Sequence, residues 1–239
     1  MRHSSDIALV PILDDLTSRT VPYVRGVLEG LMATGKRRIV LNMAEVSHVD
    51  TAGMSFILGM VRRMRECGGL LSLIDVTPGV LYSLRIARIV DLIPVRAANT
   101  PSGVPELDPS VLPLWRTTLP VNAKDLHAAR QRVSELAQRL PFSCDEVFDL
   151  TLAVGEALGN AADHTCGEGV LATVTAYPDR IVVEVTDCGD GFDGNALPDS
   201  CDPERGRGIM LMRLLVDSVC IERRANGAGT LVRLVKLTA

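Results

Sequence analysis

A run of regularly spaced prolines divides this chain of 239 residues into two parts. Within residues 98–114, every fourth position from 101 to 113 is a proline. Each proline holds its own φ near about −65° and turns the preceding residue away from helical conformation, so no regular helix or central strand passes through this stretch. We therefore predict a semi-rigid, extended linker at 98–114, a first domain at 1–97 and a second domain at 115–239.

The two predicted domains differ in charge. Residues 1–100 contain 12 Lys and Arg against 9 Asp and Glu (+3), residues 101–239 contain 13 against 20 (−7), and the sum is the net charge of −4. This balance and an aromatic content of 3% argue against direct binding of nucleic acid. The most apolar stretch, 52–61, is half the roughly 20 residues that a membrane span needs. We therefore expect a soluble, cytoplasmic protein without a membrane partner.

Hydrophobic periodicity predicts a different architecture for each domain. The first domain alternates strands with helices, which is typical of an α/β sheet covered by helices: strands at 7–13, 38–43 and 70–76, helices at 18–33, 51–66 and 78–89. The second domain is predicted as α+β, with helices on one mixed sheet: strand 115–121, helices 123–140 and 145–164, a hairpin over 170–186, helix 208–217 and a hairpin over 219–237.

Several local patterns imitate known sites but fail on context. Residues 30–36 fit GxxxxGK, yet they end a predicted helix, and Arg37 stands where a P-loop needs Ser or Thr. Residues 189–194 fit GxGxxG after a strand, but a loop follows them and Asp190 would repel phosphate. The six cysteines form no CxxC pair, so we expect reduced thiols that mostly pack, and no zinc site.

Four short motifs follow one another in the second domain. Glu156, Asn160 and His164 are spaced i, i+4, i+8 and share one helix face. Asn160 stands in a run of small apolar residues that we expect to be buried, where an amide needs a polar partner. The other three motifs are Asp187-Cys-Gly189-Asp-Gly191 at a strand end, Gly206-Arg-Gly208 at a helix start, and Gly229-Thr230 at the start of the last strand.

This order resembles the Bergerat-fold ATPase and kinase superfamily, and above all the bacterial anti-sigma factor serine/threonine kinases. The resemblance covers residues 115–239 and implies a Bergerat-fold α/β sandwich that binds ATP and Mg²⁺. Residues 156–164 match the family's N box, 187–191 its DxGxG box and 206–208 its GxG box.

The resemblance implies a role for each motif. Glu156 would be the general base on the attacking hydroxyl, and Asn160 would ligate Mg²⁺ through its amide oxygen. Asp187 would accept a hydrogen bond from the adenine amino group, with Thr230 supporting it. Gly189 and Gly191 would let the backbone approach the base. Gly206 and Gly208 would direct their amides toward the phosphates. Arg205 and Arg207 would lie within reach of a phosphate.

A histidine kinase is the nearest rival interpretation. It requires a phosphoacceptor histidine on a dimerisation helix ahead of the ATP-binding domain. His127 is predicted on a helix, but two alanines follow it instead of an acid, and no second long helix separates it from the ATP-binding motifs. We therefore expect His127 to be a surface residue.

The first domain carries a motif of its own at the start of its second helix. Residues 50–53, Asp-Thr-Ala-Gly, match a D-[ST]-[SATG]-G turn, and residues 7–96 resemble the STAS domain of anti-sigma factor antagonists. In that family the hydroxyl after the aspartate accepts a phosphate, which implies Thr51 here. We expect Thr51 at the N-cap of its helix, where a phosphate would meet the positive end of the helix dipole and the charge of Asp50.

The two resemblances together predict a fused partner-switching regulator. A kinase domain would phosphorylate a STAS hydroxyl, either Thr51 or that of a separate antagonist, and the partners would be a sigma factor, a STAS-type anti-anti-sigma protein, or a second copy in a homodimer. Two alternatives stay open: a non-enzymatic, ATP-gated binding module, and a kinase whose STAS domain serves only for docking or dimerisation. The linker permits transfer within one chain or between chains.

Overall fold

The computed structural model describes residues 7–98, 103–165, 169–189, 203–224 and 229–238. The chain forms two compact units, Met1–Pro101 and Ser102–Ala239. Within the described residues, no helix combines the length and the apolar character that crossing a membrane would require.

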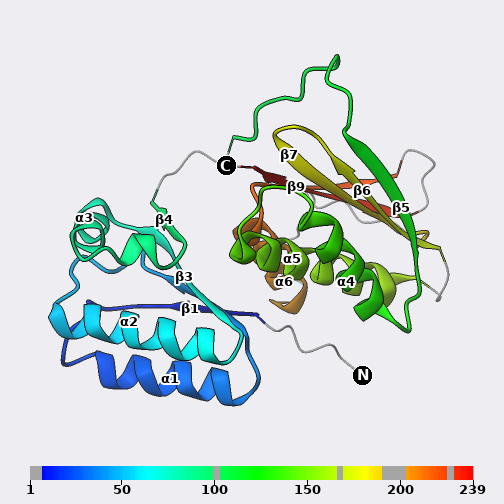
Figure 1. Cartoon of the computed structure of the whole chain (residues 1–239). Helices are drawn as coiled ribbons and strands as arrows, with labels where there is room; N and C mark the ends of the chain where they lie inside the picture. The colour runs from blue at the N-terminus through cyan, green and yellow to red at the C-terminus, as the bar shows by residue number, and fades with distance from the viewer. Residues whose placement is uncertain (1–6, 99–102, 166–168, 190–202, 225–228, 239) are drawn as a thin grey trace. The chain divides into compact units, whose positions relative to one another are not determined.

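The N-terminal unit is a parallel four-stranded sheet in the order β1-β2-β3-β4. Its strands are β1 (Ile7–Pro11), β2 (Arg38–Asn42), β3 (Leu70–Val76) and β4 (Val95–Ala97), and its helices are α1 (Val21–Ala33), α2 (Thr51–Glu66), α3 (Pro78–Ile86) and the 3-10 turn η1 (Ile89–Asp91). Figure 1 shows α1 and α2 side by side against the sheet. Alternate residues of β2 and β3 enter one core with α1, α2 and α3, among them Ile39, Leu41, Leu71 and Leu73.

The C-terminal unit is a five-stranded sheet in the order β5-β6-β7-β9-β8. Its elements are β5 (Trp115–Val121), α4 (Leu126–Ala137), α5 (Cys144–His164), β6 (Val170–Ala176), β7 (Arg180–Thr186), α6 (Pro203–Leu215), β8 (Ser218–Arg223) and β9 (Thr230–Leu237). The three helices lie over one face of this sheet (Figure 1). Every strand pair in it is antiparallel, so the expected mixed sheet was wrong.

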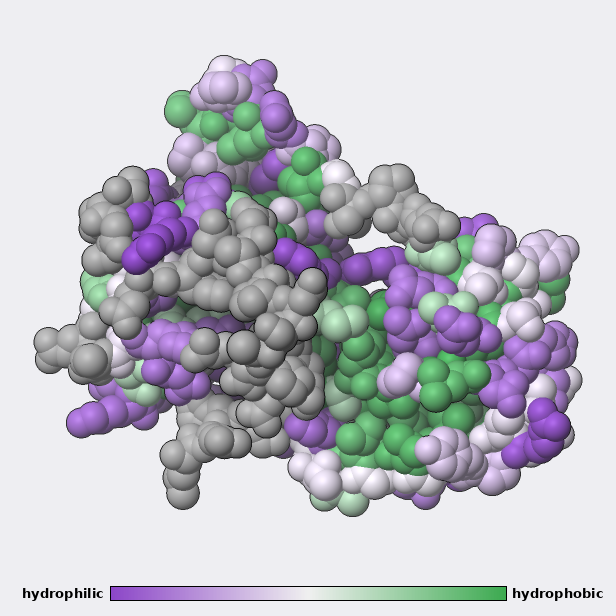
Figure 2. All heavy atoms as spheres, turned by 180° about the vertical axis from the view of Figure 1, so that it is seen from behind, coloured by the Kyte–Doolittle hydropathy of each residue, from purple (hydrophilic) through white to green (hydrophobic). Residues whose placement is uncertain are grey.

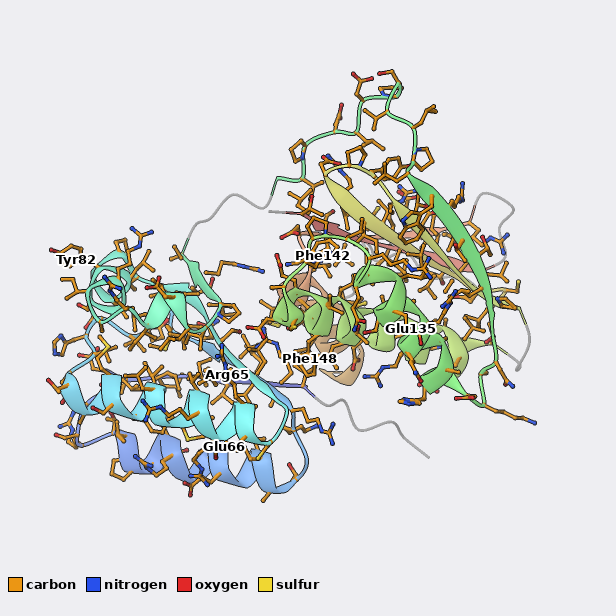
Figure 3. All side chains as sticks on the ribbon, viewed as in Figure 1. Arg65, Glu66, Tyr82, Glu135, Phe142 and Phe148 are labelled. Atoms are coloured by element: carbon orange, nitrogen blue, oxygen red, sulfur yellow. The ribbon has the colours of Figure 1, made fainter. Side chains whose placement is uncertain are left out.

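The long helix α5 begins where local sequence signals place it. Ser143 is the N-cap, its hydroxyl accepts from the Glu146 amide, and the Glu146 carboxylate accepts from the Ser143 amide, which completes a capping box. Phe142, labelled in Figure 3, occupies the position before the cap. Within this helix, the spacing i, i+4, i+8 places Glu156, Asn160 and His164 on one face.

The elements differ from expectation in several places. The strand expected at 7–13 ends at Pro11, the helix expected at 18–33 begins at Val21, and the helix expected at 123–140 spans Leu126–Ala137. The helix predicted at 78–89 breaks at Arg88, whose φ is 55°, so α3 ends at Ile86 and η1 follows. The short strand β4 follows a proline and was not predicted. Helix α6 begins at Pro203 instead of Gly208, because proline fits the first turn of a helix, where its missing N–H has no helical acceptor.

Most of the proline-rich segment contacts the C-terminal unit. Arg180 donates through Nη1 to the carbonyl oxygen of Pro105 at 2.7 Å, and its guanidinium also binds Asp179 through Nε and Nη2. The Leu114 amide donates to Ala176 at 2.8 Å, next to the pairing of β5 with β6. The Arg180 side chain is 6% exposed, so this attachment is desolvated.

Candidate nucleotide and phosphoacceptor sites

Two polar side chains of α5 lie against α6. Glu156 is half-buried and Asn160 is exposed, while the neighbouring Ala157, Leu158 and Ala161 are buried. The expectation that Asn160 is buried was therefore wrong, because its side chain lies beside Gly208 of α6, which has no side chain to cover it. An exposed amide beside a half-buried carboxylate is accessible to a ligand.

Gly208 brings the backbone of α6 to these side chains. A Cβ added at Gly208 would lie 3.5 Å from Oε2 of Glu156 and 3.6 Å from Nδ2 of Asn160. Asn160 of the N box and Gly208 of the GxG box are separated by 48 positions in the sequence. The two motifs thus meet in space.

The position of the glycines within α6 differs from expectation. Gly206 and Gly208 lie inside the helix, in its fourth and sixth positions counted from Pro203, and not at its start. From the fifth residue onward helix amides donate to the helix itself. The Gly208 amide is therefore not directed at a phosphate in this structure. For Gly206, Arg205 and Arg207 only the backbone is described, and Gly191 lies outside the described residues.

Asp187 is held at the end of β7 by backbone amides. Its Oδ1 accepts from the Gly189 amide at 2.9 Å and from the Thr230 amide at 3.1 Å, and the residue is 5% exposed. Thr230 therefore contacts Asp187 through its main chain. The two amides fix the orientation of the carboxylate.

Two glycines allow the segments around Asp187 to approach one another. A Cβ on Gly189 would overlap the carbonyl oxygen of His164, the last residue of α5, and a Cβ on Gly229 would overlap the carbonyl oxygen of Asp187. Gly229 also has a φ of 90°, which L side chains rarely adopt. The end of α5, the turn after β7 and the start of β9 therefore converge at Asp187.

Sequence reasoning missed Arg130 on α4. The Cβ that another residue would add at Gly155 would lie 2.8 Å from Nε and 3.1 Å from Cζ of Arg130. A guanidinium thus lies over α5 one residue before Glu156. No local sequence motif predicts this contact, because it joins residues of two different helices. His127, also on α4, is exposed.

The residues of this site fit ATP and a magnesium ion that the nucleotide helps to hold. Within the described residues no three His, Cys, Asp or Glu side chains could form a protein-only metal site. Mg²⁺ is commonly bound by one or two protein oxygens together with substrate phosphates, and Asn160 carries an exposed amide oxygen. Among the described cysteines, the expectation that they mostly pack was wrong for Cys67, Cys144 and Cys188, which are exposed.

In the N-terminal unit, Thr51 is exposed in the first position of α2. Its expected place at the N-cap was wrong by one residue: Asp50 is the N-cap, and its Oδ1 accepts from the Gly53 amide at 2.8 Å. The Thr51 hydroxyl is therefore not needed to cap the helix. Gly53 permits this geometry, since a Cβ there would overlap the carbonyl oxygen of Leu16.

Two carboxylates join the loop after β1 to the turn that carries Thr51. Asp15 accepts from the amides of Ser47 and His48 and from the Ser47 hydroxyl, each at 2.9 Å, and Oδ2 of Asp50 accepts from the Ser18 amide at 3.0 Å. Donation from the His48 amide, and next from Ser47, lowers the pKa of Asp15. Donation from the amides of Gly53 and Ser18 lowers the pKa of Asp50. Thr51 therefore follows an ionised carboxylate.

Comparison with known proteins finds a domain family for each unit. The model of the histidine kinase-like ATPase domain family matches residues 119–236, and that of the STAS domain family matches residues 1–100. The serine-protein kinase RsbW of Halalkalibacterium halodurans is 33% identical over 115 residues, which cover 43% of this chain and 71% of the relative. The chain belongs to the family of the RsbW serine-protein kinases. RsbW of Bacillus subtilis is 30% identical over 133 residues, covering 49% of this chain and 81% of that protein.

Two solved structures each align with a part of the present chain. The RsbU and RsbW domains of Rv1364c from Mycobacterium tuberculosis align with a TM-score of 0.41 at 17% identity, over 53% of this chain and 34% of that chain. The anti-sigma factor antagonist SpoIIAA in its unphosphorylated form aligns with a TM-score of 0.33 at 17% identity, over 42% of this chain and 86% of that chain. These likenesses are too distant to carry an argument. The family matches support a partner-switching regulator with a kinase-like ATPase domain.

Proposed function

We propose that this protein is an ATP-dependent serine/threonine kinase that transfers phosphate to a STAS hydroxyl and thereby controls a sigma factor. The proposal rests on the observation that Gly208 lies beside the side chains of Glu156 and Asn160. Two backbone amides also fix the carboxylate of Asp187 at the end of β7. These residues come from three separate motifs of the sequence.

Each residue has a defined part in the proposed transfer. Asp187 accepts a hydrogen bond from the adenine amino group, and Asn160 holds Mg²⁺ through its amide oxygen. When bound, Mg-ATP supplies the phosphoryl group and the charge neutralisation that its transfer needs. Glu156 accepts the proton of the attacking hydroxyl as the new O–P bond forms and the bond from the γ-phosphorus to ADP breaks. Gly208 keeps the space beside Glu156 and Asn160 free of a side chain.

Thr51 is the proposed acceptor within this chain. It is exposed, follows a cap that another residue supplies, and stands at the positive end of the α2 dipole. A phosphate there adds negative charge beside Asp50, which changes the surface that a partner meets without removing a helix contact. The proposed partners are a sigma factor, a STAS-type anti-anti-sigma protein and a second copy of the chain. Figure 2 shows hydrophobic side chains gathered on one face of the N-terminal unit, a feature typical of partner-binding surfaces.

The test is to incubate the purified chain with Mg-ATP and map phosphate by intact-mass and peptide mass spectrometry. We expect phosphate on Thr51 in the wild type and none in Thr51→Ala. Glu156→Ala should lower transfer by about 10²- to 10⁴-fold, the usual contribution of a general base, while ATP affinity is retained. ATP binding without any transfer, also when a separate STAS protein is supplied, would contradict the kinase and favour the ATP-gated binding module.

A mixing experiment separates transfer within a chain from transfer between chains. Glu156→Ala keeps the acceptor and lacks the base, whereas Thr51→Ala keeps the base and lacks the acceptor. Phosphate on the Glu156→Ala chain after mixing requires transfer between chains. Labelling of the wild type at a rate independent of dilution, with none in the mixture, requires transfer within one chain.

A further inference from the structure

Four strand ends meet at the turn that carries Asp187. The turn follows β7, Gly169 precedes β6, Arg224 follows β8, and Gly229 precedes β9. Of these residues, only Gly229 and Asp187 belong to motifs singled out in the sequence. Arg224 is half-buried and was assigned no role.

Arg224 binds the main chain of this turn. Its Nη1 donates to the carbonyl oxygen of Asp187 at 3.3 Å and lies 3.7 Å from Sγ of Cys188. Its own amide donates to the carbonyl of Gly229 at 3.1 Å, so the base of the side chain is fixed as well. Cys188 in turn donates through Sγ to the carbonyl of Gly169 at 3.6 Å.

The contact falls just beyond the regular pairing of the sheet. The ladder between β7 and β9 ends with Thr186 opposite Leu231, and the Asp187 amide still donates to Thr230. The Asp187 carbonyl, one step further, accepts from the Arg224 guanidinium. Two amides therefore orient the carboxylate of Asp187, and a cation holds the peptide that carries it.

We propose that Arg224 is a positioning residue for adenine recognition, which acts by holding the main chain of Asp187 in the orientation that its carboxylate needs. This inference rests on the proposed binding of ATP at Asp187. Without Arg224 the turn keeps its amide contacts but loses a side chain that joins it to the end of β8. The carboxylate then has to be ordered when the nucleotide binds, which weakens binding of the base and leaves the phosphates unaffected.

The test compares ATP with inosine triphosphate, which differs in carrying an oxygen in place of the adenine amino group. Calorimetric titration of Arg224→Ala should show ATP bound about five- to tenfold more weakly, the effect of one hydrogen bond of ordinary strength, and inosine triphosphate bound nearly as in the wild type. Arg224→Lys, which keeps one donor, should recover part of the difference. Arg223→Ala, an exposed neighbour on β8, is the matched control and should bind both nucleotides as the wild type does.

A second measurement reads the turn without nucleotide. Hydrogen exchange at the amides of Gly189 and Thr230 should be faster in Arg224→Ala and unchanged in Arg223→Ala, with the rest of the C-terminal unit protected as before. Equal loss of both nucleotides, unchanged ATP affinity, or a fall in transfer at saturating ATP would overturn the proposal. If Arg224→Ala fails to fold, Arg224→Lys and Arg224→Gln carry the same comparison.

The two proposals fail in different ways. A wild-type chain that binds ATP but transfers no phosphate contradicts the kinase and leaves the nucleotide comparison intact. A wild-type chain that prefers ATP, with the same preference in Arg224→Ala, contradicts only the role of Arg224. A wild-type chain that does not bind ATP contradicts both.

Discussion

At the scale of single residues, a missing side chain decides how the turn before Thr51 packs. Gly53 lies where a Cβ would overlap the Leu16 carbonyl oxygen and come within 2.8 Å of Cγ1 of Val49. Gly53→Ala should therefore lower the free energy of unfolding by about 1–3 kcal/mol, as overpacking does, measured by urea denaturation of the full chain. Gly59→Ala on the same helix meets nothing within 4 Å and should not destabilise. Equal stability of the two variants would contradict the assigned contact.

The carboxylates of Asp15 and Asp50 predict how this turn responds to acid. Both pKa values are lowered in the folded chain by amide donors, from an ordinary value of 3.8. Their contribution to stability is therefore complete above the unfolded pKa and is lost as the pH falls through the folded pKa values. Unfolding midpoints measured from pH 5 down to pH 2 should fall less steeply in Asp50→Asn, which still caps the helix but does not titrate. An acid slope as steep as that of the wild type would be inconsistent with this account.

At the scale of elements, a substitution in helix α6 should change both the stability of the fold and the proposed phosphate transfer. Gly208 lies in a helix interior, where alanine is more favourable by about 1 kcal/mol. The added Cβ would be in ordinary contact with Glu156 and Asn160. Gly208→Ala should thus raise the midpoint of thermal unfolding and lower phosphate transfer, because a methyl group occupies the space beside the base. Gly30→Ala on α1, which faces open space, should stabilise without a loss of transfer. Full transfer by Gly208→Ala would contradict the placement of the site.

At the scale of the whole molecule, one side chain decides how much of the proline-rich segment is free to act as a linker. Arg180 is buried, binds Asp179 and donates to the Pro105 carbonyl. Arg180→Ala should release the segment 103–111 and make it a preferred site of limited proteolysis, with fragments identified by mass spectrometry. Arg116→Ala, which removes an exposed partner of Glu184, is the control. Cleavage at the same sites and rate in both variants would show that Arg180 does not hold the segment.

Much of the fold follows from signals a few residues long. The prolines of residues 98–114 separate two units, the capping box at Ser143 starts α5, and hydrophobic alternation places most strands. The motif of residues 50–53 and the boxes at Glu156 and Asp187 indicate which chemistry each unit carries. These features depend on backbone conformation and side-chain type within one turn or strand, which neighbouring residues determine.

Contacts between distant segments were decided by the tertiary structure alone. These contacts include the antiparallel pairing of the second sheet, the position of Gly208 beside Glu156, and the attachments made by Arg180 and Arg224. Each of them joins segments that are far apart in the sequence, and the exposure of Asn160 likewise depends on how the helices pack. The sequence does not show whether an arginine side chain is solvated or binds the main chain of a turn. Its role depends on which carbonyl oxygen the packed elements bring within reach of its guanidinium. The sequence by itself therefore determined the division into two units and the motifs of the proposed sites, whereas only packing decided which groups orient the residues of those motifs.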